Sequence, residues 1–238
     1  MATNRFKITV DWIWRMIRYN LKIIFANKFI WFLLAALGFF ILVTLITLFK
    51  GNMFTSGTIF SLLLYPGLLL IFYPTAFGIQ NDEDTRILEI LFGIPDYRYK
   101  VWLVRLILIF ILVFVVLMIL SVFCSWALVK FSALDMAFYL ILPVFFMGSL
   151  AFLLSTVIRN GIGTAVVMVI IGIVFTSLAD AIQNSKWNVF LNPFNMPQDI
   201  SEAAWATVIH DNHVILLVGI IITMLAGLLS LQRREKFI

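Results

Sequence analysis

Long uncharged apolar runs constrain the fold of this chain more than any other feature. No Asp, Glu, Lys or Arg occurs between Lys28 and Lys50, or between Lys50 and Asp82. A bilayer core about 30 Å thick is crossed by about 20 helical residues, at a rise of about 1.5 Å each. Only 12% of the 238 residues are charged, against about 25% in ordinary soluble domains. Almost the whole chain is therefore predicted to lie in a membrane, and no soluble domain of useful size fits in what remains.

The predicted fold class is an all-α polytopic membrane protein. Backbone groups in lipid must be hydrogen-bonded within their own segment, and apolar runs of this length differ from the short alternating strands of a membrane barrel. Six transmembrane helices are expected, at about 29–49, 59–80, 102–129, 136–158, 161–182 and 214–231. The chain then consists of an interfacial N-terminal region, residues 1–28, and a six-span transmembrane domain, residues 29–238.

The distribution of basic residues predicts the orientation. With six spans, 14 of the 17 Lys and Arg residues fall on one side, and the other side receives Lys50, Lys130 and Lys186. Positively charged segments stay in the cytoplasm, so both termini are predicted to be cytoplasmic, with the spans in the cell (inner) membrane. Because the basic residues flank the spans and form no single patch, the lipid bilayer is an expected partner and nucleic acid is not.

Two smaller features agree with this assignment. The first 28 residues hold too many charges for the apolar core of a cleavable signal peptide, so the first span is expected to insert uncleaved. The single cysteine, Cys124, lies in an apolar run and cannot form an intrachain disulfide. We expect it to behave as a small apolar residue.

The segment before the first span is predicted to form an amphipathic helix over about 8–27. Asp11, Arg15, Arg18 and Lys22 recur at i, i+4, i+7 and i+11 and form one polar stripe. Trp and Ile side chains lie largely off this stripe, a pattern that favours a helix lying flat at the headgroup boundary. The alternative is a simple basic flank of the first span.

The longest segment outside the spans, residues 183–213, is predicted to be on the outer side. Pro193 and Pro197 break helix there, and a short helix could begin near Asp199 or Ser201 as N-cap. Its aromatic residues predict a re-entrant or interfacial segment that caps the spans, with an ordinary interfacial loop as the alternative. His210 and His213 are expected at the solvated end of this segment, because two histidines at i, i+3 fall short of the four ligands of a closed zinc site.

A charged segment, residues 81–100, interrupts the apolar runs between the second and third spans. Asp82 or Asp84 is suited to cap the N-terminus of a short helix, since an acidic residue there is favoured by the helix dipole. Gly93 and Pro95 would end that helix. Its apolar residues, Ile87, Leu88 and Leu91, need a cover in the cytoplasm. This predicts a docking surface for a soluble partner, against the alternative of a solvated helix without one.

Here the chain resembles the membrane subunits of type-2 ABC exporters. Many of these permeases carry, between spans two and three, a segment of the form Glu-x-Gly-Thr-Leu-Glu-x-Leu-Leu-Ser-x-Pro followed by a basic residue. In this sequence Asp84 stands at the first acidic position, Leu88-Glu89 at Leu-Glu, Leu91 at the first Leu of the pair and Pro95 at the proline, with Arg98 and Lys100 as the basic residues.

The match has departures and also extends along the chain. Arg86-Ile87 replaces Gly-Thr, and Phe92-Gly93 replaces Leu-Ser. The span count, the elbow-like N-terminal helix and the Asn192-Pro193-Phe194 segment before the last span are similar to the family as well, so the resemblance covers essentially all 238 residues.

The resemblance implies that the segment at about 82–94 is a cytoplasmic coupling helix, which docks on a separate ABC ATP-binding subunit. The apolar side chains that insert into the partner would be those of Ile87, Leu88 and Leu91. The charged side chains that pair at the edge of the contact would be those of Asp84, Arg86 and Glu89. A second copy of the permease, or a homologue, would complete the substrate path. ATP and Mg would be bound by the partner subunit, since this chain has no phosphate-binding G-x-x-x-x-G-K-[ST] motif. The chain itself is not expected to be an enzyme or to hold a catalytic residue, a metal or a cofactor.

The substrate path implied by the resemblance is lined by spans two and five. Tyr65 and Tyr73 in span two and Thr164 in span five are the candidate lining residues, with helix packing as the alternative for the two tyrosines. The shortage of charge within the spans suggests an amphipathic or apolar cargo. The rival function is a polytopic membrane enzyme, or a membrane-assembly protein acting on lipids, without an ATPase partner.

Overall fold

The computed structural model of the chain describes residues 29–51, 53–84 and 98–231, and these residues form helices joined by connections that are short except for the segment 182–201. The long helices are α2 (Phe29–Phe49), α3 (Ser56–Ala76), α6 (Val104–Ala127), α7 (Ala133–Ile158), α8 (Gly161–Ala181) and α9 (Glu202–Ser230). Two short elements, α4 (Gly78–Asp84) and the π-helical turn η1 (Arg98–Leu103), lie at one end of the bundle.

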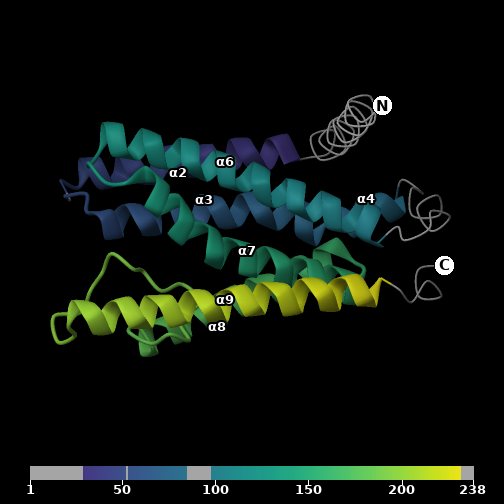
Figure 1. Cartoon of the computed structure of the whole chain (residues 1–238). Helices are drawn as coiled ribbons and strands as arrows, with labels where there is room; N and C mark the ends of the chain where they lie inside the picture. The colour runs from purple at the N-terminus through teal and green to yellow at the C-terminus, as the bar shows by residue number, and fades with distance from the viewer. Residues whose placement is uncertain (1–28, 52, 85–97, 232–238) are drawn as a thin grey trace, which may run out of the picture.

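Six helices in the described part of the chain are long and apolar enough to cross a membrane. They run up and down along one direction (Figure 1), so α2 begins and α9 finishes at the same end of the bundle as α4. We call this end the α4 end. The opposite end carries the segment 182–201 between α8 and α9, and we call it the loop end. The chain is therefore a multi-pass helical membrane protein.

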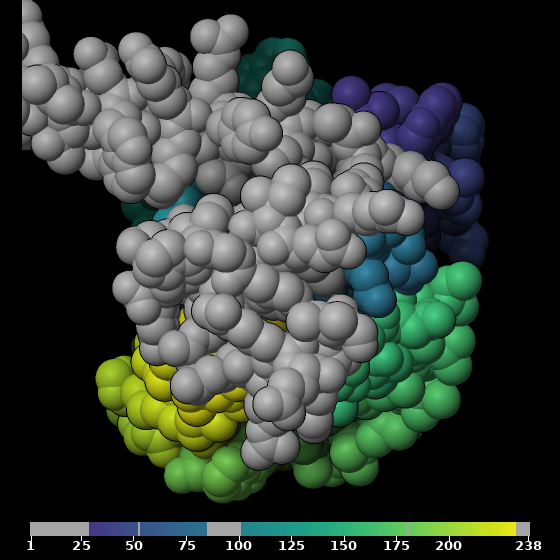
Figure 2. All heavy atoms as spheres, turned by 90° about the vertical axis from the view of Figure 1, so that its right-hand side faces the viewer, coloured from purple at the N-terminus to yellow at the C-terminus, as the bar shows by residue number. Residues whose placement is uncertain are grey.

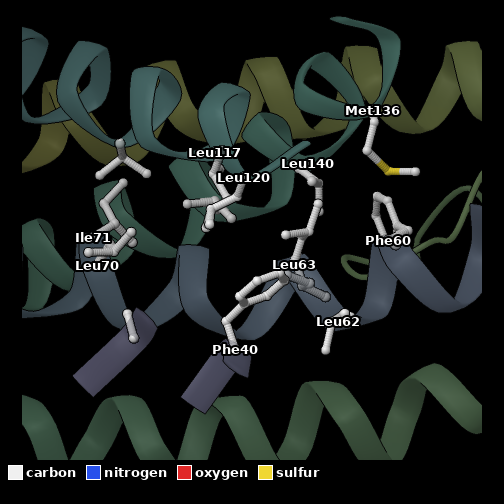
Figure 3. Packing of buried hydrophobic residues seen from close by; sticks show 14 of the residues in the cluster. Phe40, Phe60, Leu62, Leu63, Leu70, Ile71, Leu117, Leu120, Met136 and Leu140 are labelled. Carbon is white, nitrogen blue, oxygen red and sulfur yellow. The ribbon is translucent and has the colours of Figure 1, made fainter. Parts of the chain in front are cut away.

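Helix α7 is the centre of the bundle. It packs against α9, α3, α6 and α8, while α3 also packs against α2 and α6. Buried side chains of α2, α3, α6 and α7 meet in one apolar core (Figure 3), which includes Phe40, Phe60, Leu63, Leu117 and Leu140. Helix α8 lies at the edge of the bundle, because only 11% of its most apolar stretch is buried.

Close approach between helices depends on small residues, which drive helix association in membranes through van der Waals contact. A Cβ added to Gly148 of α7 would lie 2.5 Å from Ile71 Cδ1 of α3. A Cβ added to Gly227 of α9 would lie 2.7 Å from Phe152 Cε1 of α7. These glycines let α7 contact α3 and α9 at short distance.

The observed helices agree with five of the predicted spans to within a few residues, and the sixth differs. Helix α9 begins at Glu202, twelve residues before the predicted start at 214. Ser201 is its N-cap, with a side chain that accepts a hydrogen bond from the Ala204 amide at 3.4 Å. The short helix expected near Asp199 or Ser201 is thus the first part of one 29-residue helix. At about 1.5 Å per residue it measures about 43 Å, the thickness of a bilayer with its headgroups.

The second difference concerns Asp82. We expected Asp82 or Asp84 to cap the start of a helix, but both lie in the last turn of α4, which follows α3 after Phe77. Asp82 is buried and does not act as an N-cap. The predicted N-terminal helix over 8–27, and most of the predicted coupling helix, lie outside the described residues.

Candidate functional site

The candidate coupling segment can be placed only through its two flanks. Of its predicted contact residues, Asp84 is described, and it is the exposed last residue of α4. The other six lie outside the described residues: Arg86, Ile87, Leu88, Glu89, Leu91 and Pro95. The described flanks of the segment, α4 and η1, lie at the end of the bundle that Figure 2 faces.

These flanks are joined by a buried ion pair. The guanidinium Nη1 of Arg105 donates to Oδ2 of Asp82 at 2.7 Å, and the two side chains are only 5% and 4% exposed. The Arg105 guanidinium also lies over the ring of Trp102, 4.6 Å from its centroid. Removing one partner of a buried pair costs about 3–5 kcal/mol, because the other charge is left uncompensated. Asp82 and Arg105 therefore hold the end of α4 to the start of α6.

Sequence reasoning missed this pair. It assigned Asp82 to a helix cap and Arg105 to the flank of a span. A usable signal existed, because each residue stands at the edge of an apolar run and the two runs are consecutive antiparallel spans. Opposite charges at membrane depth pair with one another.

Hydrogen bonds also connect α4 to α8 and the end of α3 to α7. Gln80 Oε1 accepts a hydrogen bond from the Gly161 amide at 2.6 Å, at the start of α8. Ser155 of α7 donates its hydroxyl to the Ala76 carbonyl at 2.9 Å, where α3 ends. The freed carbonyl at the α3–α4 junction is thus satisfied by a neighbouring helix, as membrane interiors require.

A second apolar cluster completes the α4 end. It brings together buried residues of α4, η1, α6, α7 and α9, namely Ile79, Trp102, Leu106, Phe152 and Leu228, with Leu231 just after α9. Trp102 is 2% exposed and its ring lies 6.0 Å from that of Phe152. The two flanks of the coupling segment are consequently attached to α3, α6, α7, α8 and α9.

The three residues predicted for the substrate path are not brought together. Tyr65 is 50% exposed and lines a groove between α3 and α8. Tyr73 is buried, with its ring stacked on Phe32 at 4.5 Å and on Phe77 at 5.5 Å. Thr164 is buried and donates its hydroxyl to the Asn160 carbonyl at 2.9 Å. The position of Tyr73 is that of a residue in helix packing, the alternative given above. Tyr73 follows Tyr65 by eight residues, which places it about 80° around the helix from Tyr65.

The two histidines lie on α9, not in a loop. With Asp135 and Tyr139 they line a hollow of about 510 Å³ at the loop end, and the His213 ring is 5.3 Å from that of Tyr139. Within the described ranges, no group of three or more His, Cys, Asp or Glu side chains is arranged to hold a metal ion.

The segment 182–201 folds back over the start of α3 at the loop end. Asn192 Nδ2 donates to the Gly57 carbonyl at 2.9 Å, and Trp205 Nε1 of α9 donates to the Pro193 carbonyl at 3.0 Å. Buried Asn212 of α9 donates to the carbonyls of Lys186 and Asn188, both at 2.8 Å. The segment therefore forms an ordered cap on this end of the bundle.

Comparison with protein-family models, with curated proteins and with solved structures gives no match for this chain.

Proposed function

We propose that this chain is the transmembrane permease subunit of an ATP-driven exporter of the type-2 ABC class. Two permease subunits, two copies of this chain or this chain with a homologue, would enclose the substrate path and open it by relative rotation. Two ABC ATP-binding subunits would hold ATP and Mg and would carry out the hydrolysis. This chain would contact them through the cytoplasmic helix at about 82–94.

The observation that carries the proposal is the mechanical connection of the segment 85–97. One flank ends in α4 and the other begins in η1, and the Asp82–Arg105 pair joins them. Gln80, Ser155 and the Trp102 cluster link the same region to α7, α8 and α9. A force applied to the segment would therefore move several transmembrane helices together, which is what a subunit driven by a soluble ATPase needs.

The proposed orientation places the α4 end in the cytoplasm of the cell (inner) membrane. The positive-inside rule supports it, since Arg98, Lys100, Arg105 and Arg159 lie at that end, and the basic segments 1–28 and 232–238 adjoin in sequence the start of α2 and the end of α9 there. Both termini would then be cytoplasmic, and the cap 182–201 would face outward.

The experiment is affinity purification of the tagged full chain from its native membrane, followed by ATPase measurement on the complex. We expect an ABC ATP-binding subunit to co-purify. Leu88→Asp and Leu91→Asp should each lower its yield and the ATPase rate at least about tenfold, since a charge buried in an apolar contact costs several kcal/mol. Met196→Asp is the matched control, because it places the same charge on the 45% exposed Met196 at the loop end.

Recovery of the chain without any ATPase would refute the proposal and favour the rival, a lipid-acting membrane enzyme or assembly protein. ATPase activity equal in wild type, Leu88→Asp and Leu91→Asp would refute the assignment of the coupling helix.

A further inference from the structure

A groove between α3 and α8 runs along the described transmembrane helices. It consists of two sections of about 380 and 590 Å³, which share Tyr65, Leu68, Met147 and Gly172. Met147 of α7 belongs to both sections and lies beneath the gap between α3 and α8. The groove exists because α8 packs mainly on α7 and barely touches α3.

The two sections differ in chemistry. The only side-chain polar group of the section nearer the middle of the bundle is the Tyr65 hydroxyl. Besides the shared residues, this section is lined by Phe39, Leu69, Ile71, Phe72, Met168 and Val169. The section nearer the loop end adds Ser61 of α3 and Thr176 of α8. No charged residue lines either section. The groove is thus apolar at one end and carries uncharged hydroxyls at the other.

The hydroxyls are available to a ligand. Tyr65 is half exposed, and its hydroxyl has no hydrogen-bond partner in the part of the chain that the structure describes. Ser61 and Thr176 donate to backbone carbonyls of their own helices, at 3.3 Å to Gly57 and 3.0 Å to Gly172, and keep their acceptor lone pairs. From Ser61 to Phe72 the groove extends about 17 Å along α3, at about 1.5 Å per residue.

We propose that this groove binds an uncharged amphiphile with a single apolar chain. The polar head, a hydroxyl or amide group, lies at Ser61, Tyr65 and Thr176, towards the loop end. The chain lies along Leu68, Phe72 and Met168. Charged headgroups are disfavoured because the lining offers no counter-ion, and an unpaired charge away from water costs several kcal/mol. That such amphiphiles are the exported cargo rests on the proposed function, whereas their binding does not.

Gly172 offers a direct way to fill the groove. A Cβ at Gly172 would meet no atom within 4 Å, and Gly172 lines both sections, so Gly172→Leu adds a side chain to the groove wall without a clash at its Cβ. Replacing a helix-interior glycine also raises helix propensity by about 1 kcal/mol. Gly38→Leu is the matched control, because Gly38 of α2 has equally open surroundings and is not among the residues that line the groove.

The test is photolabelling of the full chain in phosphatidylcholine vesicles with a monoacylglycerol that carries a diazirine at the end of its chain. We expect saturable labelling of peptides containing Phe72 and Met168, competed by unlabelled monoacylglycerol and not by lysophosphatidylglycerol of the same chain length. Gly172→Leu should lower the saturable labelling about tenfold, the effect of losing about two methylene contacts. Gly38→Leu should leave it unchanged.

Labelling that does not saturate, or equal competition by the anionic lipid, would overturn the inference. It would also be overturned if Gly172→Leu altered the oligomeric state and left labelling unchanged, since the groove would then be a contact with a second copy. The assay contains no ATPase, so its failure leaves the proposed function standing, and failure to recover an ATPase leaves the binding result standing.

Discussion

At the scale of single residues, the Asp82–Arg105 pair is a buried charge pair with a large energetic consequence. Two charges at 4–5% exposure are costly to bury, and apolar replacements of a buried pair are often neutral or stabilising. The pair is therefore better explained by registry than by stability: it specifies that the last turn of α4 meets the first turn of α6.

Asp82→Ala should lower the unfolding free energy of the detergent-solubilised chain by about 3–5 kcal/mol, because Arg105 is left buried without its carboxylate. Arg105→Met should have a similar effect. The double variant Asp82→Ala/Arg105→Met should recover most of the loss, which a double-mutant cycle of denaturant unfolding measures. Additive losses would show that the two side chains do not act as a pair.

At the scale of elements, α9 and the cap 182–201 depend on each other. Asn212 is only 3% exposed and its amide group serves two loop carbonyls, so it ties the cap to the helix. Hydropathy showed that the apolar part of α9 begins at 214, but it did not show where the helix begins. The helix can start earlier because it needs only backbone hydrogen bonds and an N-cap, which Ser201 provides.

Asn212→Leu should release the cap, because two loop carbonyls lose their hydrogen-bond donor, which costs about 1–3 kcal/mol of stability. Amide hydrogen exchange of the peptide 186–200 should rise about tenfold or more, while exchange in α7 stays unchanged. Lys186→Ala is the control, since it removes only the exposed 3.1 Å ion pair with Asp211, which is worth about 0–1 kcal/mol. Equal exchange in Asn212→Leu and wild type would contradict this role.

At the scale of the whole molecule, six antiparallel helices put residues 84 and 186 at opposite ends. In a Cys124→Ala background, Arg86→Cys and Lys186→Cys should therefore react with a membrane-impermeant maleimide from opposite sides. We expect position 186 to be labelled in intact cells and position 86 only after the membrane is opened. Labelling of both positions from one side would contradict six crossings, and the reverse pattern would contradict the proposed orientation.

The sequence alone predicted the six helices that are long and apolar enough to cross a membrane in the described part of the chain, the bounds of five of them to within a few residues, and the unequal distribution of basic residues between their ends. These properties are local, because each span satisfies its own backbone and its apolar length must match the bilayer. Only the tertiary structure decided which faces meet: that Asp82 finds Arg105, that Tyr73 is packed while Tyr65 lines a groove, and that Asn212 holds the cap. The physical reason is that lipid and protein interior are both apolar, so a helix facing either carries nearly the same residues and its sequence does not mark the face that packs.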